Sequence, residues 1–175
     1  LYYNTFDLQW YRTWALSLQN GFFDCYARLM DVQNGLDYPP VYLFLLYPLG
    51  KLYTLLDLRD YAMYDMIAMK AWPILFDVLT AGLLYFVCRR ESEKLGVLAA
   101  ALWALNPSTI FNCSNWGQTD CIMIFLLVAA FYQAERQRPF AASILFAVAC
   151  LTKMQTLYFT PVLFLFLLRR YRLPR

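Results

Sequence analysis

Long apolar blocks separated by short polar segments fill the chain from residue 66 to residue 168. A membrane span needs about 20 mostly apolar residues, and three of these blocks approach that length: residues 66–88, 95–113 and 121–134. A fourth block, residues 140–168, is too long for one span and contains Lys153, Gln155 and Pro161. The pattern favours two short helices joined by a tight turn. The alternative is one tilted or broken helix with a mid-span lysine, at a cost of about 2.5–3.5 kcal/mol.

The first third of the chain has two shorter amphipathic stretches. Residues 6–18 place Trp10 and Trp14 with other apolar residues at helical spacing, and Asn20-Gly21 ends this stretch. Residues 41–56 are apolar but short, and they carry Pro48 and Lys51. Both stretches are therefore predicted to lie in the outer membrane interface rather than to cross it.

The predicted fold is all-α, a multi-pass transmembrane helical bundle with two interfacial helices in a large first external loop. This loop occupies residues 1–65. Five membrane helices follow, at about residues 66–88, 95–113, 119–134, 139–152 and 156–168. Because the chain starts without a methionine and stops directly after an apolar run, we expect a piece that is incomplete at both ends and inactive alone.

Composition supports a membrane protein and excludes several other classes. Hydrophobic residues make up 61% of the chain and charged residues 15%, whereas soluble domains average roughly 45–50% and about 25%. A net charge of +3 indicates no nucleic-acid partner. The chain has no histidine and no C-x-x-C pair, so histidine-based catalysis and common zinc motifs are excluded. No metal ligand or cofactor is predicted, and a divalent metal is left open.

Basic residues gather in three short segments between the predicted spans. They are Arg89, Arg90 and Lys94; Arg136 and Arg138; and Arg169, Arg170, Arg172 and Arg175. Such loops face the cytoplasm, and only the division of residues 140–168 puts the last cluster on that side. Most aspartates then fall on the opposite, outer side. We expect a multi-pass integral membrane protein, with a bacterial plasma membrane favoured over the endoplasmic reticulum.

Candidate chemistry gathers on this outer side. Asp7 fits a helix N-cap or first-turn acid, and it also fits a general base that takes a proton from an incoming hydroxyl. Asp37 and Tyr38 precede two prolines that supply a helix start, which leaves the acid and the phenol themselves without a structural reason. These residues are candidates for substrate contact.

The polar segment at residues 112–120 is either a simple turn or a sugar site. Asn106-Pro107 ahead of it is expected to end or kink the preceding helix. Trp116 with Gln118 and Asp120 combines an aromatic plate with hydrogen-bonding groups, which suits a sugar.

Lysines at two predicted span ends complete the candidates. Lys70 and Lys153 either snorkel to lipid headgroups or hold a phosphate, and Gln155 lies beside Lys153. Asp77, inside a span, is either functional or bonded to a neighbouring helix.

Several of these segments together resemble the GT-C glycosyltransferases. The motifs are Asp7 with Trp14, Asp37-Tyr38-Pro39-Pro40-x-Tyr42, Lys70-x-x-Pro73-x-x-x-Asp77, Asn106-Pro107, Trp116-Gly117-Gln118-x-Asp120 and Lys153-x-Gln155. The resemblance is closest to bacterial proteins similar to the second mannosyltransferase of GPI-anchor synthesis.

This resemblance implies inverting transfer of a hexose, typically mannose, on the outer or lumenal membrane face. The donor would be a polyprenyl- or dolichyl-phosphate sugar among the membrane lipids, and the acceptor a glycan, glycolipid or protein. Asp7 would be the base. Asp37, Tyr38, Trp116, Gln118, Asp120 and Gln155 would bind substrates, and Lys153 and Lys70 would bind phosphate.

Two other classes compete. A transporter or lipid flippase module would use Lys70, Asp77 and Lys153 as a charged pathway, but the sequence has no convincing internal repeat. A purely structural membrane subunit would leave the polar clusters without a purpose. An enzyme further requires Asp7 and the turn at Trp116–Asp120 to lie within about 15 Å of each other, because the two substrates must meet.

Overall fold

The computed structural model describes residues 6–29, 35–58 and 62–171, and among these residues every regular element is a helix. The predicted all-α class is confirmed. Residues 1–5 of the predicted external loop, and Arg172 and Arg175 of the last basic cluster, lie outside the described residues. The elements are α1 (Phe6–Ser17), η1 (Leu18–Asn20), α2 (Cys25–Leu29), α3 (Pro40–Leu55), α4 (Ala62–Cys88), α5 (Glu93–Ala104), α6 (Pro107–Thr109), η3 (Ile110–Trp116), α7 (Asp120–Glu135), α8 (Pro139–Cys150), η4 (Met154–Phe159) and α9 (Thr160–Tyr171).

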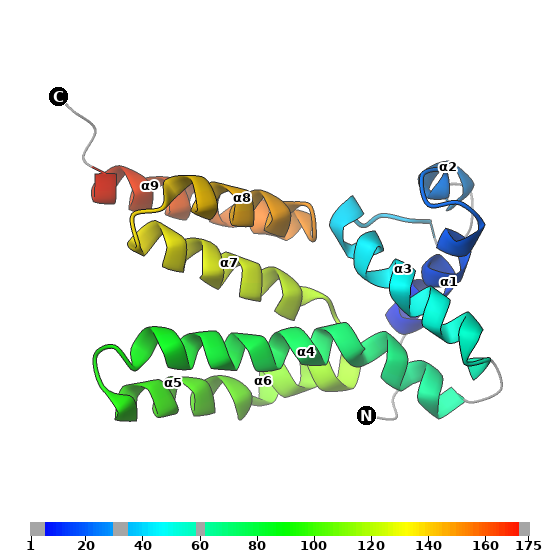
Figure 1. Ribbon diagram of the computed structural model, residues 1–175, viewed down its shortest axis with the longest axis horizontal. Helices are drawn as coiled ribbons and strands as arrows, with labels where there is room; N and C mark the ends of the chain where they lie inside the picture. Colours follow the sequence, from blue (N-terminus) through cyan, green and yellow to red (C-terminus); the bar gives the residue numbers. More distant parts are fainter. Residues whose placement is uncertain (1–5, 30–34, 59–61, 172–175) are drawn as a thin grey trace.

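The longer helices form a bundle with the first three helices gathered at one end. Helix α4 packs against α5 and α7, and α7 packs against α8. The α4–α5 and α7–α8 connections and the end of α9 lie at the far end of the bundle from α1–α3 (Figure 1). The basic segments of the sequence therefore share one end of the molecule, and the polar candidates lie toward the other.

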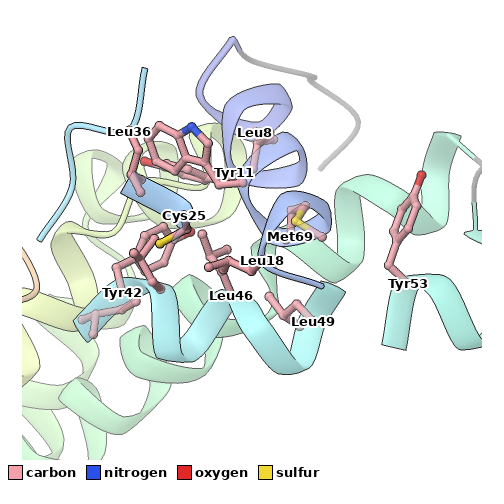
Figure 2. Close-up of a cluster of buried hydrophobic side chains, with 14 of the residues drawn as sticks. Leu8, Tyr11, Leu18, Cys25, Leu36, Tyr42, Leu46, Leu49, Tyr53 and Met69 are labelled. Atoms are coloured by element: carbon pink, nitrogen blue, oxygen red, sulfur yellow. The ribbon is translucent and has the colours of Figure 1, made fainter. Parts of the chain in front are cut away.

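An apolar core joins α1 and α3 to the start of α4. Tyr11 and Trp14 of α1 pack with Tyr42 of α3, and Met69 of α4 closes the cluster; all four are at most 1% exposed (Figure 2). The Tyr11 and Tyr42 rings meet edge to face with centroids 5.0 Å apart, a favoured aromatic geometry. This core fixes α1, and with it Asp7, relative to the bundle.

Gly50 allows α1 and α3 to approach closely. A Cβ at this position would lie 2.2 Å from the Ala15 carbonyl oxygen and 2.6 Å from Gln19 Nε2. Gln19 in turn bridges the two helices, because its Nε2 donates to the carbonyls of Ala15 (3.0 Å) and Tyr47 (3.1 Å). The crossing leaves no room for a side chain.

Gly50→Ala is therefore expected to force α1 from α3 and to destabilise the protein by about 1–3 kcal/mol, the usual range for overpacking. Thermal unfolding of the purified protein measures this loss. Gly82→Ala in α4 is the matched control, since a Cβ at Gly82 meets nothing within 4 Å. Equal melting temperatures for both variants would contradict the tight crossing.

The helix before the polar segment bends at Asn106, as the sequence predicted. Asn106 leaves the helical conformation, and its Oδ1 accepts a hydrogen bond from the Ser108 amide (2.9 Å). Pro107 then begins a new helical segment. The two segments, Glu93–Ala104 and Pro107–Trp116, meet at 44°. The chain thus continues through the predicted break as a bent helix, which ends at Trp116.

The long apolar stretch at residues 140–168 is divided in the structure. Helix α8 ends at Cys150, and a 3-10 helix, η4, leads into α9. The Thr156 hydroxyl holds the junction, because it lies 3.0 Å from the Ala149 carbonyl and 2.9 Å from that of Lys153. The second helix begins at Thr160, slightly later than predicted, because η4 occupies the intervening residues.

Among the described residues, one helix is long and apolar enough to cross a membrane by length and composition. It is Ile67–Cys88 within α4, and only 11% of its most apolar window is buried in the described structure. The bent pair formed by Glu93–Ala104 and Pro107–Trp116 passes the same test if it is counted as one span. Helix α8 is apolar but shorter. The other predicted crossings remain predictions.

Candidate active site

A polar cavity of about 300 Å³ lies where α1 meets three segments that are distant from it in the sequence. Its lining is Asp7, Trp10, Asp37, Tyr38, Pro39, Gln118, Lys153, Met154 and Gln155. The start of α3 is tied to the end of α8 by a hydrogen bond from the Val41 amide to the Leu151 carbonyl (3.0 Å). This bond places the Asp37-Tyr38 segment beside Lys153. The cavity therefore collects six of the nine predicted site residues.

Asp7 lies in the first turn of α1, and its carboxylate accepts hydrogen bonds from across the cavity. Trp116 Nε1 and Gln118 Nε2 both donate to Asp7 Oδ2, each at 2.5 Å. The two donors lie more than 100 residues further along the chain. The structure thus brings Asp7 and the segment at residues 112–120 into direct contact, well inside the separation that a shared site requires.

Gly117 explains why Trp116 and Gln118 point to the same carboxylate. Residues Ile110–Trp116 form a π-helix, a rare element that is frequent at functional sites. Gly117 ends it with φ +80°, a left-handed conformation that favours glycine. The chain reverses at this residue, so the side chains before and after it converge on Asp7.

Two tyrosines, Tyr38 at the cavity wall and the buried Tyr11, orient the Gln118 amide. Tyr11 and Tyr38 hydroxyls lie 2.9 Å apart, and they lie 3.4 and 3.5 Å from Gln118 Oε1. Burial raises the pKa of Tyr11, so its hydroxyl remains a donor. With Oε1 accepting on this side, Nε2 is directed at Asp7.

The sequence did not single out Tyr11. Its position one turn after Asp7 is the signal that could have found it, since residues i and i+4 share a helix face.

Lys153 and Asp120 form an ion pair at the edge of the cavity. Lys153 Nζ contacts Asp120 Oδ1, and the two side chains are 12% and 31% exposed. Asn112 Nδ2 donates to the other carboxylate oxygen (2.9 Å). Asp120 also lines a second cavity of about 430 Å³ on the side of Trp103 and Asn112. The pair thus lies between two cavities. Asn112 was not predicted to take part.

The remaining predicted residues differ in where they lie. Trp116 reaches the cavity through its contact with Asp7. Lys70 does not line it: its side chain is fully buried, and its Nζ donates to the Asn115 carbonyl (2.6 Å). Asp77 accepts a hydrogen bond from Trp103 Nε1 (2.8 Å), an interhelical contact between α4 and α5.

Acidic and sulfur ligands are spread through the described part of the chain. Within it, no group of three or more such side chains is placed to hold a metal ion. In the cavity, the Asp7 carboxylate accepts from Trp116 and Gln118, and the Lys153 ammonium pairs with Asp120.

A comparison with known protein families identifies the class of enzyme to which this protein belongs. The model of glycosyltransferase family 87 matches residues 36–173, which include all of the predicted site residues except Asp7. The protein is a GT-C glycosyltransferase, an enzyme of the transferase type. The chain belongs to glycosyltransferase family 87, whose members are typically membrane proteins. No curated protein and no solved structure matches the chain.

Proposed function

We propose that this enzyme transfers a hexose from a polyprenyl-phosphate carrier to an acceptor hydroxyl at the outer membrane face. Mannose is the proposed sugar. Asp7 is the general base. As the acceptor oxygen bonds to the anomeric carbon, the bond from that carbon to the phosphate oxygen breaks. The acceptor proton passes to the Asp7 carboxylate, and the polyprenyl phosphate leaves with the electron pair. A single displacement of this kind inverts the anomeric configuration.

The observation that carries the proposal is the Asp7 carboxylate held by two donors at the wall of a polar cavity. Fixing a base in one orientation favours proton transfer, because a base must lie within hydrogen-bond reach of the proton it accepts. Two donors from separate side chains prevent rotation of the carboxylate away from the cavity. Trp116, which is 36% exposed and donates to Asp7, is the proposed aromatic surface on which a sugar ring packs.

Lys153 and Gln155 are the proposed contacts of the leaving phosphate. Both line the same cavity as Asp7. An ammonium group has three hydrogen-bond donors. Lys153 can therefore keep its ion pair with Asp120 and still donate to a phosphate oxygen. Asp37 and Tyr38 also line this cavity and are the proposed contacts of the sugar hydroxyls.

A lipid-linked donor fits the outer surface of the bundle. The apolar window of α4 is mostly unburied, although its composition is that of a core or membrane helix. Leu98 and Leu102 of α5, and Leu105 directly after it, are more than half exposed. A bilayer would cover these faces and would supply the donor laterally to a cavity near its edge. The five predicted crossings remain part of this proposal.

Transfer of labelled mannose by the complete protein in proteoliposomes tests the proposal. We expect transfer from polyprenyl-phosphate mannose and none from GDP-mannose, with the new linkage inverted relative to the donor. Lys153→Gln is expected to raise the donor KM roughly tenfold or more, since a hydrogen bond to a charged group contributes about 1.5–3 kcal/mol. Lys51→Gln on α3 is the matched control. A nucleotide-sugar donor, or retained configuration, would refute the proposal.

The competing transporter hypothesis requires Lys70, Asp77 and Lys153 to form one pathway. In the structure each of them contacts a different partner: the Asn115 carbonyl, Trp103 and Asp120. These contacts do not link the three charges to one another, and they favour the enzyme.

A further inference from the structure

Lys70 is a charged residue that lies buried beside the apolar core. Its side chain is 0% exposed, beside Met69 of the apolar core. Lysine is almost never fully buried unless it is paired, because desolvating an ammonium is costly. Lys70 Nζ donates to the backbone carbonyl of Asn115 at 2.6 Å. The fold thus retains a charged donor directly against the π-helix that carries Trp116.

The stem of Lys70 also touches the reversal that follows the π-helix. A Cβ at Gly117 would lie 3.1 Å from Lys70 Cγ. Lys70 therefore contacts the residues immediately before and after Trp116. Trp116 is the residue whose indole donates to Asp7. A π-helix is rare, and an external donor on one of its last carbonyls stabilises that conformation.

We propose that Lys70 is a positioning residue, which fixes the Asn115 carbonyl and thereby holds Trp116 and Gln118 on the Asp7 carboxylate. The expected loss of kcat rests on the proposed function. The structural role of Lys70 does not. It assigns Lys70 a role different from the phosphate contact that the sequence suggested, because the side chain does not line the cavity. Lys70 acts through Trp116 and touches no substrate.

The first test is spectroscopic and does not depend on catalysis. The ¹⁵N-indole signal of Trp116 in the complete protein is assigned with Trp116→Phe and then recorded in Lys70→Met, which keeps an unbranched side chain one atom shorter and loses the donor. We expect this signal to shift upfield, as its hydrogen bond to Asp7 lengthens. The matched control is Lys51→Met, which leaves the signal in place. An unchanged signal in Lys70→Met would overturn the inference.

The second test separates positioning from phosphate binding. Lys70→Met is expected to lower kcat about 10–100-fold, the range for a displacement of about 1 Å at a reacting centre, with the donor KM within about twofold of the wild type. The double variant with Trp116→Phe is expected to lose little more than Lys70→Met alone, because both changes act on one contact. A raised donor KM with unchanged kcat would overturn the inference and restore the phosphate role.

Folding and function can be told apart in this design. If Lys70→Met does not fold, Lys70→Gln is recorded in the same way, and its shorter donor is expected to give an intermediate indole shift; a wild-type signal would again overturn the inference. If the wild-type protein does not transfer mannose from a polyprenyl-phosphate donor, the proposed function fails. The indole shift still decides the role of Lys70.

Discussion

Replacing Asp7 with asparagine is expected to lower kcat for sugar transfer by about 10²–10⁴-fold, the usual contribution of a general base. The amide oxygen can still accept hydrogen bonds from Trp116 and Gln118, so the cavity keeps its shape. What is lost is the basic oxygen that takes the proton of the acceptor hydroxyl. The rate is measured at saturating donor and acceptor with the complete protein.

The control for this change is Asp24→Asn, because Asp24 is an exposed acid outside the cavity. Both variants should unfold at the temperature of the wild type. Donor and acceptor KM values in Asp7→Asn should stay within a few-fold, since the loss falls on the chemical step. Turnover near the wild-type rate would remove Asp7 as the base and leave it a structural first-turn acid.

Much of the fold follows from local sequence signals. Helical spacing of Trp10 and Trp14 predicts the helix observed at Phe6–Ser17, and the prolines after Tyr38 predict the start observed at Pro40. These signals act within a few residues, so a sequence pattern records them. The π-helix at Ile110–Trp116 could not be predicted in this way, because its stabilising contacts come from α4 and α1.

The sequence predicted which residues belong to the candidate site, but it did not predict which side chains contact one another there. Asp7, Gln118 and Lys153 were singled out by their chemistry, and the structure brings them to one cavity. Lys70 looks the same as Lys153 in the sequence, since both are lysines at the end of an apolar block. Only the packing of α4 against the segment before Gly117 shows that Lys70 is buried. Whether such a lysine is buried or lines the cavity depends on contacts between segments more than 40 residues apart, which a local sequence pattern does not record.

Gly117→Ala is expected to lower kcat about 10²-fold or more, through the geometry of the site rather than its chemistry. Gly117 has φ +80°, where a residue with a Cβ is strained by roughly 1–2 kcal/mol. The added Cβ would also lie 2.7 Å from Leu8 Cδ2, and Leu8 is the neighbour of Asp7. Relief of this clash moves the segment away from α1. A displacement of about 1 Å at the base is enough for the stated loss.

Two variants separate the backbone effect from the steric effect at Gly117. Asparagine tolerates the left-handed conformation, yet it brings the same Cβ against Leu8. If contact with Leu8 dominates, Gly117→Asn should lose as much activity as Gly117→Ala. If backbone strain dominates, it should retain more. Gly82→Ala is the control and should keep full activity, because a Cβ there meets nothing within 4 Å. Wild-type turnover in Gly117→Ala would show that Trp116 and Gln118 need not converge on Asp7 for transfer.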